Sequence, residues 1–381
     1  MVRVRGLEGV VATTSAISSI QHDRLTYRGY SIQDLAKQAT FEEVIYLLWH
    51  GELPSGPQLA ALKAELTENA NVPEAIFSMM RTLPFAHVHP MAVLRTAVSA
   101  LGQFDEQADV VDAGGGKQKA LHIQAKIATL VAGLARIRNG LSPLAPERTL
   151  SYAANFLYML SGSKPSAIEA ETFDAALILH ADHELNASTF TARVCVATLS
   201  DMYSGVTAAI GALKGPLHGG ANEQVMRMLE QLHSQEEATA YIDHALTCKQ
   251  KIMGFGHRVY KNGDPRAQIL KRMAEQLTCG TAYERLYQLS AHIEQLIGAR
   301  KGLLPNTDFY SATIYHALGI ETDLFTPVFA ISRTAGWTAH ILEQYSDNRL
   351  IRPRAEYDGK ALRPYIPLRD RQAPQHQQAD L

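Results

Sequence analysis

Hydrophobic residues recur every three or four positions along most of this chain, with polar residues between them, which is the spacing of amphipathic helices. A Thr-x-x-Glu capping box at Thr40 and Glu43 opens one such helix, and Gly51 and Pro54 end it. Its apolar face follows the i, i+3, i+4, i+7 pattern: Phe41, Val44, Ile45 and Leu48. The pattern predicts a mainly helical protein.

Further helices begin at prolines or polar caps. Pro90 opens one, Asp264 and Pro265 open a second, and Thr326 and Pro327 open a third that is rich in small residues. Two more stripes have helical spacing: Phe173, Ala176, Leu177 and His180, and Ala221, Val225, Met228, Leu229 and Leu232. Each stripe supplies one buried face of a helix.

Only the N-terminal part of the chain suggests strands, at Val10–Thr13 and Leu25–Tyr27. Three consecutive glycines at 114–116, flanked by charged residues, predict an exposed loop. The length of 381 residues is enough for about two domains. We therefore expect an all-α fold of two domains with short N-terminal strands.

The charge balance gives no general reason to bind a polyanion. The chain has 36 Lys and Arg against 38 Asp and Glu, a net charge of -2, so we expect neither a nucleic acid nor a membrane as partner. Hydrophobic residues make up 46% and charged residues 19%, which is typical of a folded globular protein. The most apolar stretch, 187–213, is interrupted by Arg193 and Asp201, and we expect it to be buried helix.

The three cysteines, Cys195, Cys248 and Cys279, are widely spaced and form no CxxC pair. This sparse, odd set favours a reducing compartment over a disulfide framework or a structural zinc site. Residues 1–17 lack a long apolar segment behind a basic start, so we expect no secretory signal. The expected location is the cytoplasm.

Two histidines lie in glycine-containing loops. His218 precedes Gly219 and Gly220 and then a helix stripe, and the positive potential of a helix N-terminus would keep its imidazole neutral. A neutral imidazole there could donate a hydrogen bond to a developing enolate oxygen, or His218 could simply cap its own helix. His257 follows Gly256, and it is either a site residue or a loop histidine in water.

Asp308 and Arg266 both stand at the start of a predicted helix. Asp308 is either an N-cap or a general base whose pKa is raised by apolar neighbours such as Phe309. Arg266 lies in the first turn after Asp264, where a cation opposes the helix dipole unless it has an anionic partner. That partner is either a ligand carboxylate or an internal Asp or Glu.

Arg333 stands in an otherwise apolar helix, and a buried guanidinium needs a planar partner such as a carboxylate. Arg352 and Arg354 add two guanidinium groups near the C-terminus, where solvated charge is the alternative. His180 and His183 are three positions apart and suggest a metal site. The spacing is not that of an HExxH motif and no cysteine is near, so we predict no metal.

These segments together resemble the citrate synthase family. The matching elements occur in the family's order and cover nearly the whole chain, except the final tail: YRGY from Tyr27, HPM from His89, His183-Glu184, GPLHGGAN from Gly215, GFGHRVYK from Gly254, PNTDFYS from Pro305, SRTAGW from Ser332 and IRPRAEYDG from Ile351. One such motif would be weak evidence, but the ordered set is specific. The nearest similarity is to the short bacterial type, which includes citrate and 2-methylcitrate synthases.

The resemblance implies an all-helical, two-domain subunit that works as an obligate homodimer. The large domain would comprise residues 1–218 and 323–381, and the small domain 219–322. The implied substrates are acetyl-CoA and oxaloacetate, with no cofactor. The implied catalytic residues are His218, His257 and Asp308. The oxaloacetate carboxylates would be held by His183, Arg266, Arg333 and, from the partner subunit, Arg352.

The implied coenzyme A contacts are Gly254, Phe255, Gly256, Lys261 and Lys301. Two departures from the family pattern stand at Ala312, where glycine is common, and at Glu321, where proline is common. Alanine at the first position also occurs in sequences that resemble methylcitrate synthases, so 2-methylcitrate synthase using propionyl-CoA is the alternative. From another class, the chain could be a helical acyl-CoA-binding or assembly protein without turnover. A metallohydrolase at His180 and His183 is a third reading.

Overall fold

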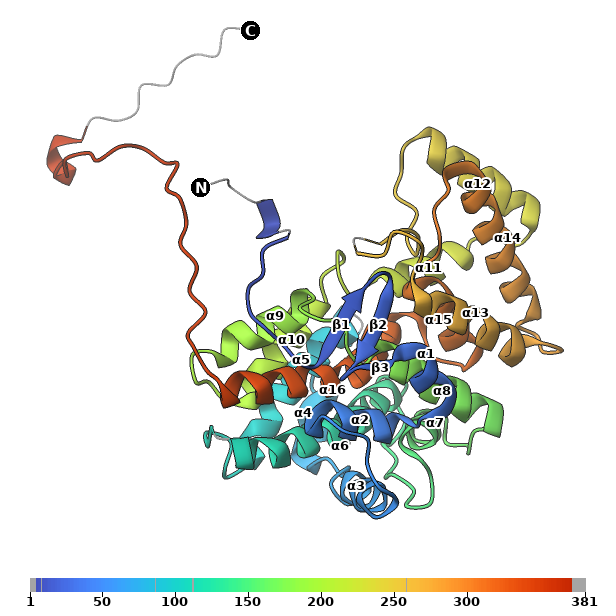
Figure 1. Ribbon diagram of the computed structural model, residues 1–381, viewed down its shortest axis with the longest axis horizontal. Coiled ribbons are helices and arrows are strands. Elements are labelled where there is room, and N and C mark those ends of the chain that lie inside the picture. Colours follow the sequence, from blue (N-terminus) through green and yellow to red (C-terminus); the bar gives the residue numbers. More distant parts are fainter. Residues whose placement is uncertain (1–4, 8, 86, 112, 258, 372–381) are drawn as a thin grey trace, which may run out of the picture. The chain divides into compact units, whose positions relative to one another are not determined.

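The computed structural model describes residues 5–7, 9–85, 87–111, 113–257 and 259–371, and these are mainly helical (Figure 1). The helices are α1 (Ile32–Gln38), α2 (Phe41–His50), α3 (Gly56–Glu68), α4 (Glu74–Arg81), α5 (Pro90–Leu101), α6 (Ala113–Arg138), α7 (Tyr152–Ser161), α8 (Ala167–His180), α9 (Ala187–Val196), α10 (Met202–Leu213), α11 (Ala221–Leu229), α12 (Gln235–Thr247), α13 (Pro265–Thr278), α14 (Glu284–Lys301), α15 (Thr307–Ala317) and α16 (Phe325–Ser346). The all-α prediction is confirmed.

Several helix signals in the sequence correspond to real caps, but Thr326 is not one, because α16 begins at Phe325 after Leu324. Thr40 accepts from the backbone of Glu43, whose side chain reaches back to the Thr40 N–H, which is the predicted capping box of α2. Pro90 opens α5, and Asp264 caps α13 in front of Pro265. These three signals depend only on residues close together in the chain, and each marks the start of a helix in the structure.

Of the two predicted N-terminal strands, the one at Leu25–Tyr27 is confirmed, because it lies within β2 (Arg24–Tyr27). β1 (Ser18–Gln21), β2 and β3 (Tyr30–Ser31) form an antiparallel sheet in that order. His22 and Asp23, both at positive φ, make the two-residue turn between β1 and β2. The strand expected at Val10–Thr13 is wrong: the strand that pairs with β2 begins at Ser18, and its pairing is set by this turn.

The glycine-rich segment at 114–116 is also not the loop that the sequence predicts, because α6 begins at Ala113 and continues through it. Gly116 is buried, and a Cβ there would lie 2.8 Å from Cδ2 of Leu342 in α16. The glycine therefore serves close helix packing. Gly115–Arg138 is the one described helix that is long and apolar enough to cross a membrane, and it is mostly buried inside the protein.

α16 is the central helix of the fold and is buried along most of its length. It packs against α2, α6, α8, α9 and α10, which surround it in Figure 1. Gly336 permits the closest approach, since a Cβ there would lie 2.3 Å from the carbonyl oxygen of Ala181. This approach brings the α16 side chains to the C-terminal end of α8.

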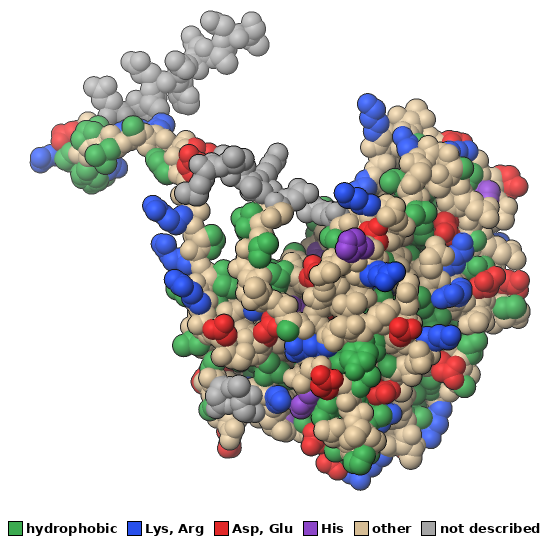
Figure 2. Space-filling model, in the orientation of Figure 1, with side chains coloured by type: hydrophobic (Ala, Val, Ile, Leu, Met, Phe, Trp, Pro, Cys, Tyr) green, Lys and Arg blue, Asp and Glu red, His purple; other side chains and the backbone are tan. Residues whose placement is uncertain are grey.

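The described residues up to Leu350 form one compact unit, and those from Ile351 form a second. The second unit is an extended segment with a short 3₁₀ turn at Leu368–Asp370. The predicted division into a large domain (1–218 and 323–381) and a small domain (219–322) stays a prediction. Acidic and basic side chains are interspersed on the face of the first unit shown in Figure 2.

Candidate active site

The C-terminal end of α8 is the structural base of the site. The last four carbonyl groups of a helix lack partners within the helix and carry its negative dipole end. Here side chains from three other elements supply the partners. They are the hydroxyl of Ser332 on Leu177, the hydroxyl of Tyr27 on Ile178 (3.1 Å), Nη1 of Arg266 on Leu179 (3.4 Å) and Nε of Arg333 on His180 (2.7 Å). Two guanidinium groups are thereby held on adjacent carbonyls.

Arg333 is a buried cation without a carboxylate partner among the described residues. It is 2% exposed, its Nε is used by the His180 carbonyl, and its guanidinium carbon lies 4.7 Å from the centre of the Phe329 ring. Burial lowers the pKa of Arg333 to about 10, with Asp182 and Tyr27 acting in the opposite direction. The one hydrogen bond of its side chain to a described residue is made by Nε, so the Nη groups have no such partner. A buried unpaired guanidinium fork is suited to a carboxylate ligand.

Arg266, in contrast, has an internal partner. Its Nε and Nη2 donate to Oδ1 and Oδ2 of Asp264 at 2.9 and 2.7 Å, and both residues are buried. Burial alone would lower the pKa of Arg266, but the Asp264 carboxylate raises it above its usual value. Asp264 also accepts from the Thr307 N–H at 3.2 Å, so one carboxylate links α13 to the start of α15. The internal-partner alternative for Arg266 is therefore the one the structure contains.

His257 is held as one tautomer by the backbone. Its Nδ1 accepts from the N–H groups of Val259 (3.0 Å) and Tyr260 (3.3 Å), so the proton of the neutral ring is on Nε2. Burial lowers the pKa of His257, and Arg266 lowers it further. His257 therefore presents a neutral N–H donor.

His183 lies against His257 and Tyr260. The ring centres of the two histidines are 5.2 Å apart, and Nε2 of His183 is 3.1 Å from the Tyr260 hydroxyl. Burial lowers the pKa of His183 well below its usual value, and Arg266 and Arg333 add to the effect. The rings of His183, His257 and Tyr260 thus form a cluster of neutral polar groups near the cations Arg266 and Arg333.

His218 is fixed by a different helix from its own. Its Nε2 accepts from the N–H of Ser188 at 3.2 Å, in the first turn of α9, and lies 2.8 Å from the Ser188 hydroxyl. The accepted N–H puts the imidazole proton on Nδ1. Burial lowers the pKa of His218 to about 4, and Arg333 contributes. The neutral state is as predicted, but α11 is capped at Gly220, so the cap alternative is wrong.

Asp308 is not the cap of α15. Asn306 is the N-cap and accepts from the Asp308 N–H at 3.0 Å, which leaves the Asp308 carboxylate without a hydrogen bond from any described residue. Burial raises the pKa of Asp308 to about 7; Arg266 and Arg333 oppose the rise and Asp264 adds to it. A partly buried carboxylate with a pKa near neutrality is suited to act as a general base.

The Gly254–Gly256 loop lies beside this carboxylate. Gly254 accepts from the Asn306 N–H, and Gly256 donates to the Leu304 carbonyl, both at 2.9 Å. The two glycines have φ of 84° and 75°, and a Cβ at Gly254 would lie 2.9 Å from the Phe309 ring. The glycines allow the loop to run against the start of α15.

The structure thus brings His183, His257 and Arg266 into one cluster, and Arg333 joins them at the end of α8. His218 is close enough to Arg333 to have its pKa lowered by it, and the pKa of Asp308 responds to both guanidinium groups. Lys261 and Lys301 are exposed. Arg352 belongs to the second unit, where Figure 2 shows a row of basic side chains.

Three residues of the site have no place in the sequence prediction. Ser188 orients His218, Tyr260 contacts His183 and His257, and Asn306 frees Asp308 by taking the cap. Asn is a favoured N-cap residue, so the role of Asn306 could have been predicted from the sequence. The metal hypothesis gains no support, because no group of three metal-ligating side chains occurs in the described part of the chain.

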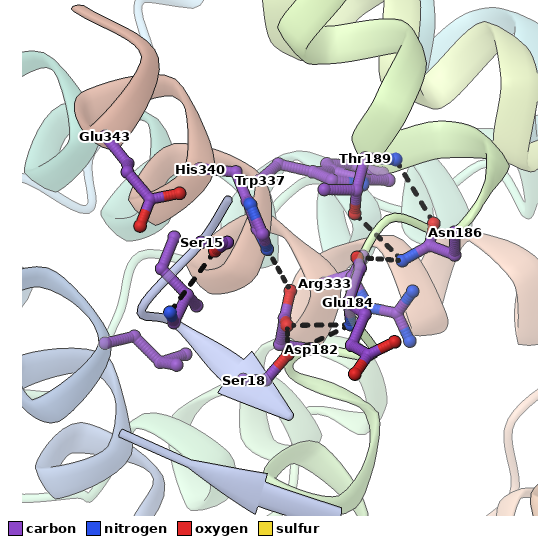
Figure 3. Close-up of polar contacts among 12 residues, drawn as sticks. Ser15, Ser18, Asp182, Glu184, Asn186, Thr189, Arg333, Trp337, His340 and Glu343 are labelled. Carbon is purple, nitrogen blue, oxygen red and sulfur yellow. Dashed lines mark hydrogen bonds and ion pairs between the residues drawn. The ribbon is translucent and has the colours of Figure 1, made fainter. Parts of the chain in front are cut away.

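A second polar cluster lies behind the site and is shown in Figure 3. Asp182 is fully buried, and its Oδ1 is 3.2 Å from Nε2 of His340 in α16. Burial raises the pKa of Asp182, but His340 and Arg333 together hold it below its usual value. Among the groups that raise the pKa of Arg333, Asp182 has the largest effect.

Comparisons with known proteins agree with one another. Residues 6–354 match the family described as "Citrate synthase, C-terminal domain". Citrate synthase 2 of Bacillus subtilis (strain 168) is 57% identical over 97% of this chain and 100% of that protein, and 2-methylcitrate synthase of Shewanella oneidensis is 43% identical over 96% and 97%. The ternary complex of carboxymethyl coenzyme A and oxaloacetate with citrate synthase from Thermoplasma acidophilum has a TM-score of 0.90, with 35% identity over 96% of this chain and 98% of that one.

Proposed function

The chain belongs to the citrate synthase family, and from this premise we propose that it condenses acetyl-CoA with oxaloacetate and water to give citrate and CoA. It is a transferase in which an acyl group becomes an alkyl group on transfer. One observation carries the proposal: an unpaired carboxylate with a pKa near 7 and two neutral imidazole donors belong to the same site as a buried guanidinium that lacks a carboxylate partner among the described residues. This set can make a carbon nucleophile next to a bound dianion.

In the first step, Asp308 removes a proton from the methyl group of acetyl-CoA. A thioester methyl is a very weak acid, so a base alone is insufficient. Nδ1–H of His218 donates to the thioester oxygen and stabilises the enol or enolate that forms. One such donor contributes about 3–4 kcal/mol to the transition state.

In the second step, the enolate carbon attacks the oxaloacetate carbonyl. Nε2–H of His257 polarises this carbonyl and supplies the proton to the new alkoxide. The Nη groups of Arg333 hold a substrate carboxylate, and His183 and Arg266 contribute to the same site. Water then hydrolyses the citryl thioester and releases CoA.

The remaining roles are part of the same proposal. Gly254, Phe255, Gly256, Lys261 and Lys301 contact coenzyme A. The small domain, 219–322, closes over oxaloacetate and excludes water, which prevents idle hydrolysis of the thioester. No metal and no cofactor takes part.

The working form is a homodimer. In it, Arg352 of each C-terminal arm, the extended segment from Ile351, reaches the oxaloacetate carboxylate of the other subunit. Support comes from the arm itself, which carries Tyr357, Leu362 and Tyr365 with most of their surface exposed. Exposed apolar side chains along an extended segment are typical of a surface that another chain covers. The free cysteines Cys195, Cys248 and Cys279 support a cytoplasmic location.

2-Methylcitrate synthase is the second candidate. The relatives include 2-methylcitrate synthases at 43% and 42% identity, and Ala312 is buried in α15 one turn beyond Asp308. Propionyl-CoA has one methylene more than acetyl-CoA, and a pocket can discriminate between two such substrates by only about 1–3 kcal/mol. Propionyl-CoA is therefore a substrate to test rather than to exclude.

The test is free-thiol release from acetyl-CoA and, in parallel, from propionyl-CoA, each with and without oxaloacetate. Oxaloacetate-dependent release supports the condensing enzyme, and the ratio of the two kcat/KM values names the product. Coenzyme A binding without thiol release from either substrate would instead support the non-catalytic binding protein.

A further inference from the structure

The loop between α8 and α9, residues 181–186, positions two of the proposed site histidines. His183 lies within it. Asn186 at its end caps α9, and that cap sets the first turn in which Ser188 meets His218. Whatever fixes this loop therefore fixes both histidines.

Asp182 shapes the loop from inside. Its Oδ2 accepts from the N–H of Glu184 at 3.1 Å, which closes an Asx turn with His183 at its apex. Glu184 has φ of 49°, in the left-handed region that non-glycine residues rarely adopt. Such a turn needs an external restraint to persist in one conformation.

β1 supplies the restraint (Figure 3). The hydroxyl of Ser18 donates to Oδ2 of Asp182 and accepts from the N–H of Glu184 at 3.0 Å. The Ile20 N–H donates to Oε1 of Glu184 at 2.6 Å. Ser18 and Ile20 are two positions apart and so face the same side of the strand. Ser19 faces the other side, and its side chain makes no hydrogen bond with a described residue.

We propose that Ser18 and Asp182 are positioning residues of the oxaloacetate site: the Ser18 hydroxyl fixes the Asp182 carboxylate, and this carboxylate aims His183. The inference rests on the proposed function, and it adds residues that the sequence pattern does not assign to the site. Asp182 also supplies the negative charge that faces Arg333 from within the fold. β1 thereby acts as a clamp on the substrate-binding loop.

Three single substitutions test the clamp. Ser18→Ala removes the hydroxyl, Ser18→Thr keeps one, and Ser19→Ala is the matched control, because Ser18 and Ser19 are neighbours with similar burial in the same strand. Hydrogen bonds to charged groups are among the stronger ones, so we expect Ser18→Ala to raise KM for oxaloacetate about ten- to a hundredfold. KM for acetyl-CoA stays near the wild-type value, Ser18→Thr restores most of the affinity, and Ser19→Ala changes neither constant.

The wild-type protein is assayed first for oxaloacetate-dependent thiol release, so that failure of the proposed function appears there. Calorimetric titration with oxaloacetate then gives the binding constant of each variant without turnover. A purely structural role would lower the melting temperature of Ser18→Ala and leave KM for oxaloacetate unchanged in the folded fraction. That result, or equal effects of Ser18→Ala and Ser19→Ala, would overturn the inference.

Discussion

The backbone N–H of Ser188 donates to Nε2 of His218 across 3.2 Å, and the side chain of Ser188 lies 2.8 Å from the same nitrogen. The Trp337 indole donates to that hydroxyl at 3.0 Å, which fixes the serine in turn. A helix N-terminal N–H is a poor neighbour for an imidazolium, because both are positive. The relationship makes His218 a neutral donor through Nδ1.

This tautomer can be measured directly. With ¹⁵N-labelled histidine, the His218 resonances should report a protonated Nδ1 and should not titrate between about pH 5.5 and about 8, because burial lowers the pKa to about 4. We expect His218→Ala to lose about 10²–10³-fold in kcat, the usual effect of removing one oxyanion donor. Titration of His218 near its ordinary pKa would contradict the assignment.

The pH dependence of kcat/KM should follow Asp308. A general base must be deprotonated, and burial raises the pKa of Asp308 to about 7, so kcat/KM for acetyl-CoA should rise with pH through about 7 and then level off. Asp308→Ala should fold normally and lose at least about 10²-fold in turnover. A wild-type profile that is flat from about pH 5.5 upward would remove Asp308 from this role.

The same carboxyl should lower stability at higher pH. Its folded pKa is above the unfolded value of 3.8, so the folded chain binds this proton more tightly and the contribution is lost as pH rises through about 7. Asp308→Asn should therefore melt at a higher temperature than the wild type near pH 8, and the difference should vanish near pH 4. Calorimetric scans at both pH values check the sign, and a lower melting temperature at pH 8 would contradict it.

Arg333→Lys should weaken oxaloacetate binding selectively. The arginine uses Nε for the His180 carbonyl and keeps its Nη fork free, and a single ammonium cannot do both. We expect KM for oxaloacetate to rise at least about tenfold while KM for acetyl-CoA changes little. Arg138→Lys is the control, because Arg138 pairs with Glu321 and Asp323 on a different part of the molecule.

Removal of metal ions should not change turnover. His180 and His183 have other partners: Nδ1 of His180 donates to the Ala176 carbonyl at 2.7 Å, and Nε2 of His183 lies 3.1 Å from the Tyr260 hydroxyl. Prolonged dialysis against EDTA, followed by the thiol-release assay, should give wild-type rates. Loss of activity that Zn²⁺ restores would support the metallohydrolase reading instead.

Local signals predicted most of the helices, because caps and apolar stripes are short-range features. The strand at Ser18–Gln21 was missed, since its pairing depends on the turn at His22 and Asp23 rather than on its own composition. The loop predicted at Gly116 was wrong because the glycine is needed for close packing against Leu342, which is far away in sequence.

The candidate site divides in the same way. The sequence was enough to predict which residue types form the site. It also contains the Asp264 partner of Arg266 two positions before the arginine. The free state of Asp308 could have been inferred from Asn306. The contact of Arg333 with the His180 carbonyl could not, because it depends on how α16 crosses the end of α8.

The anchoring of Tyr27, Arg266, Ser332 and Arg333 on the end of α8 has an evolutionary consequence. Their acceptors are main-chain oxygens, which no point mutation can replace. Side chains along α8 can therefore drift or be redesigned, within the limits of packing, while the two guanidinium groups keep their places. An engineer who wishes to change the acid that this protein accepts has most freedom on the helix and least at the four residues that bind to it.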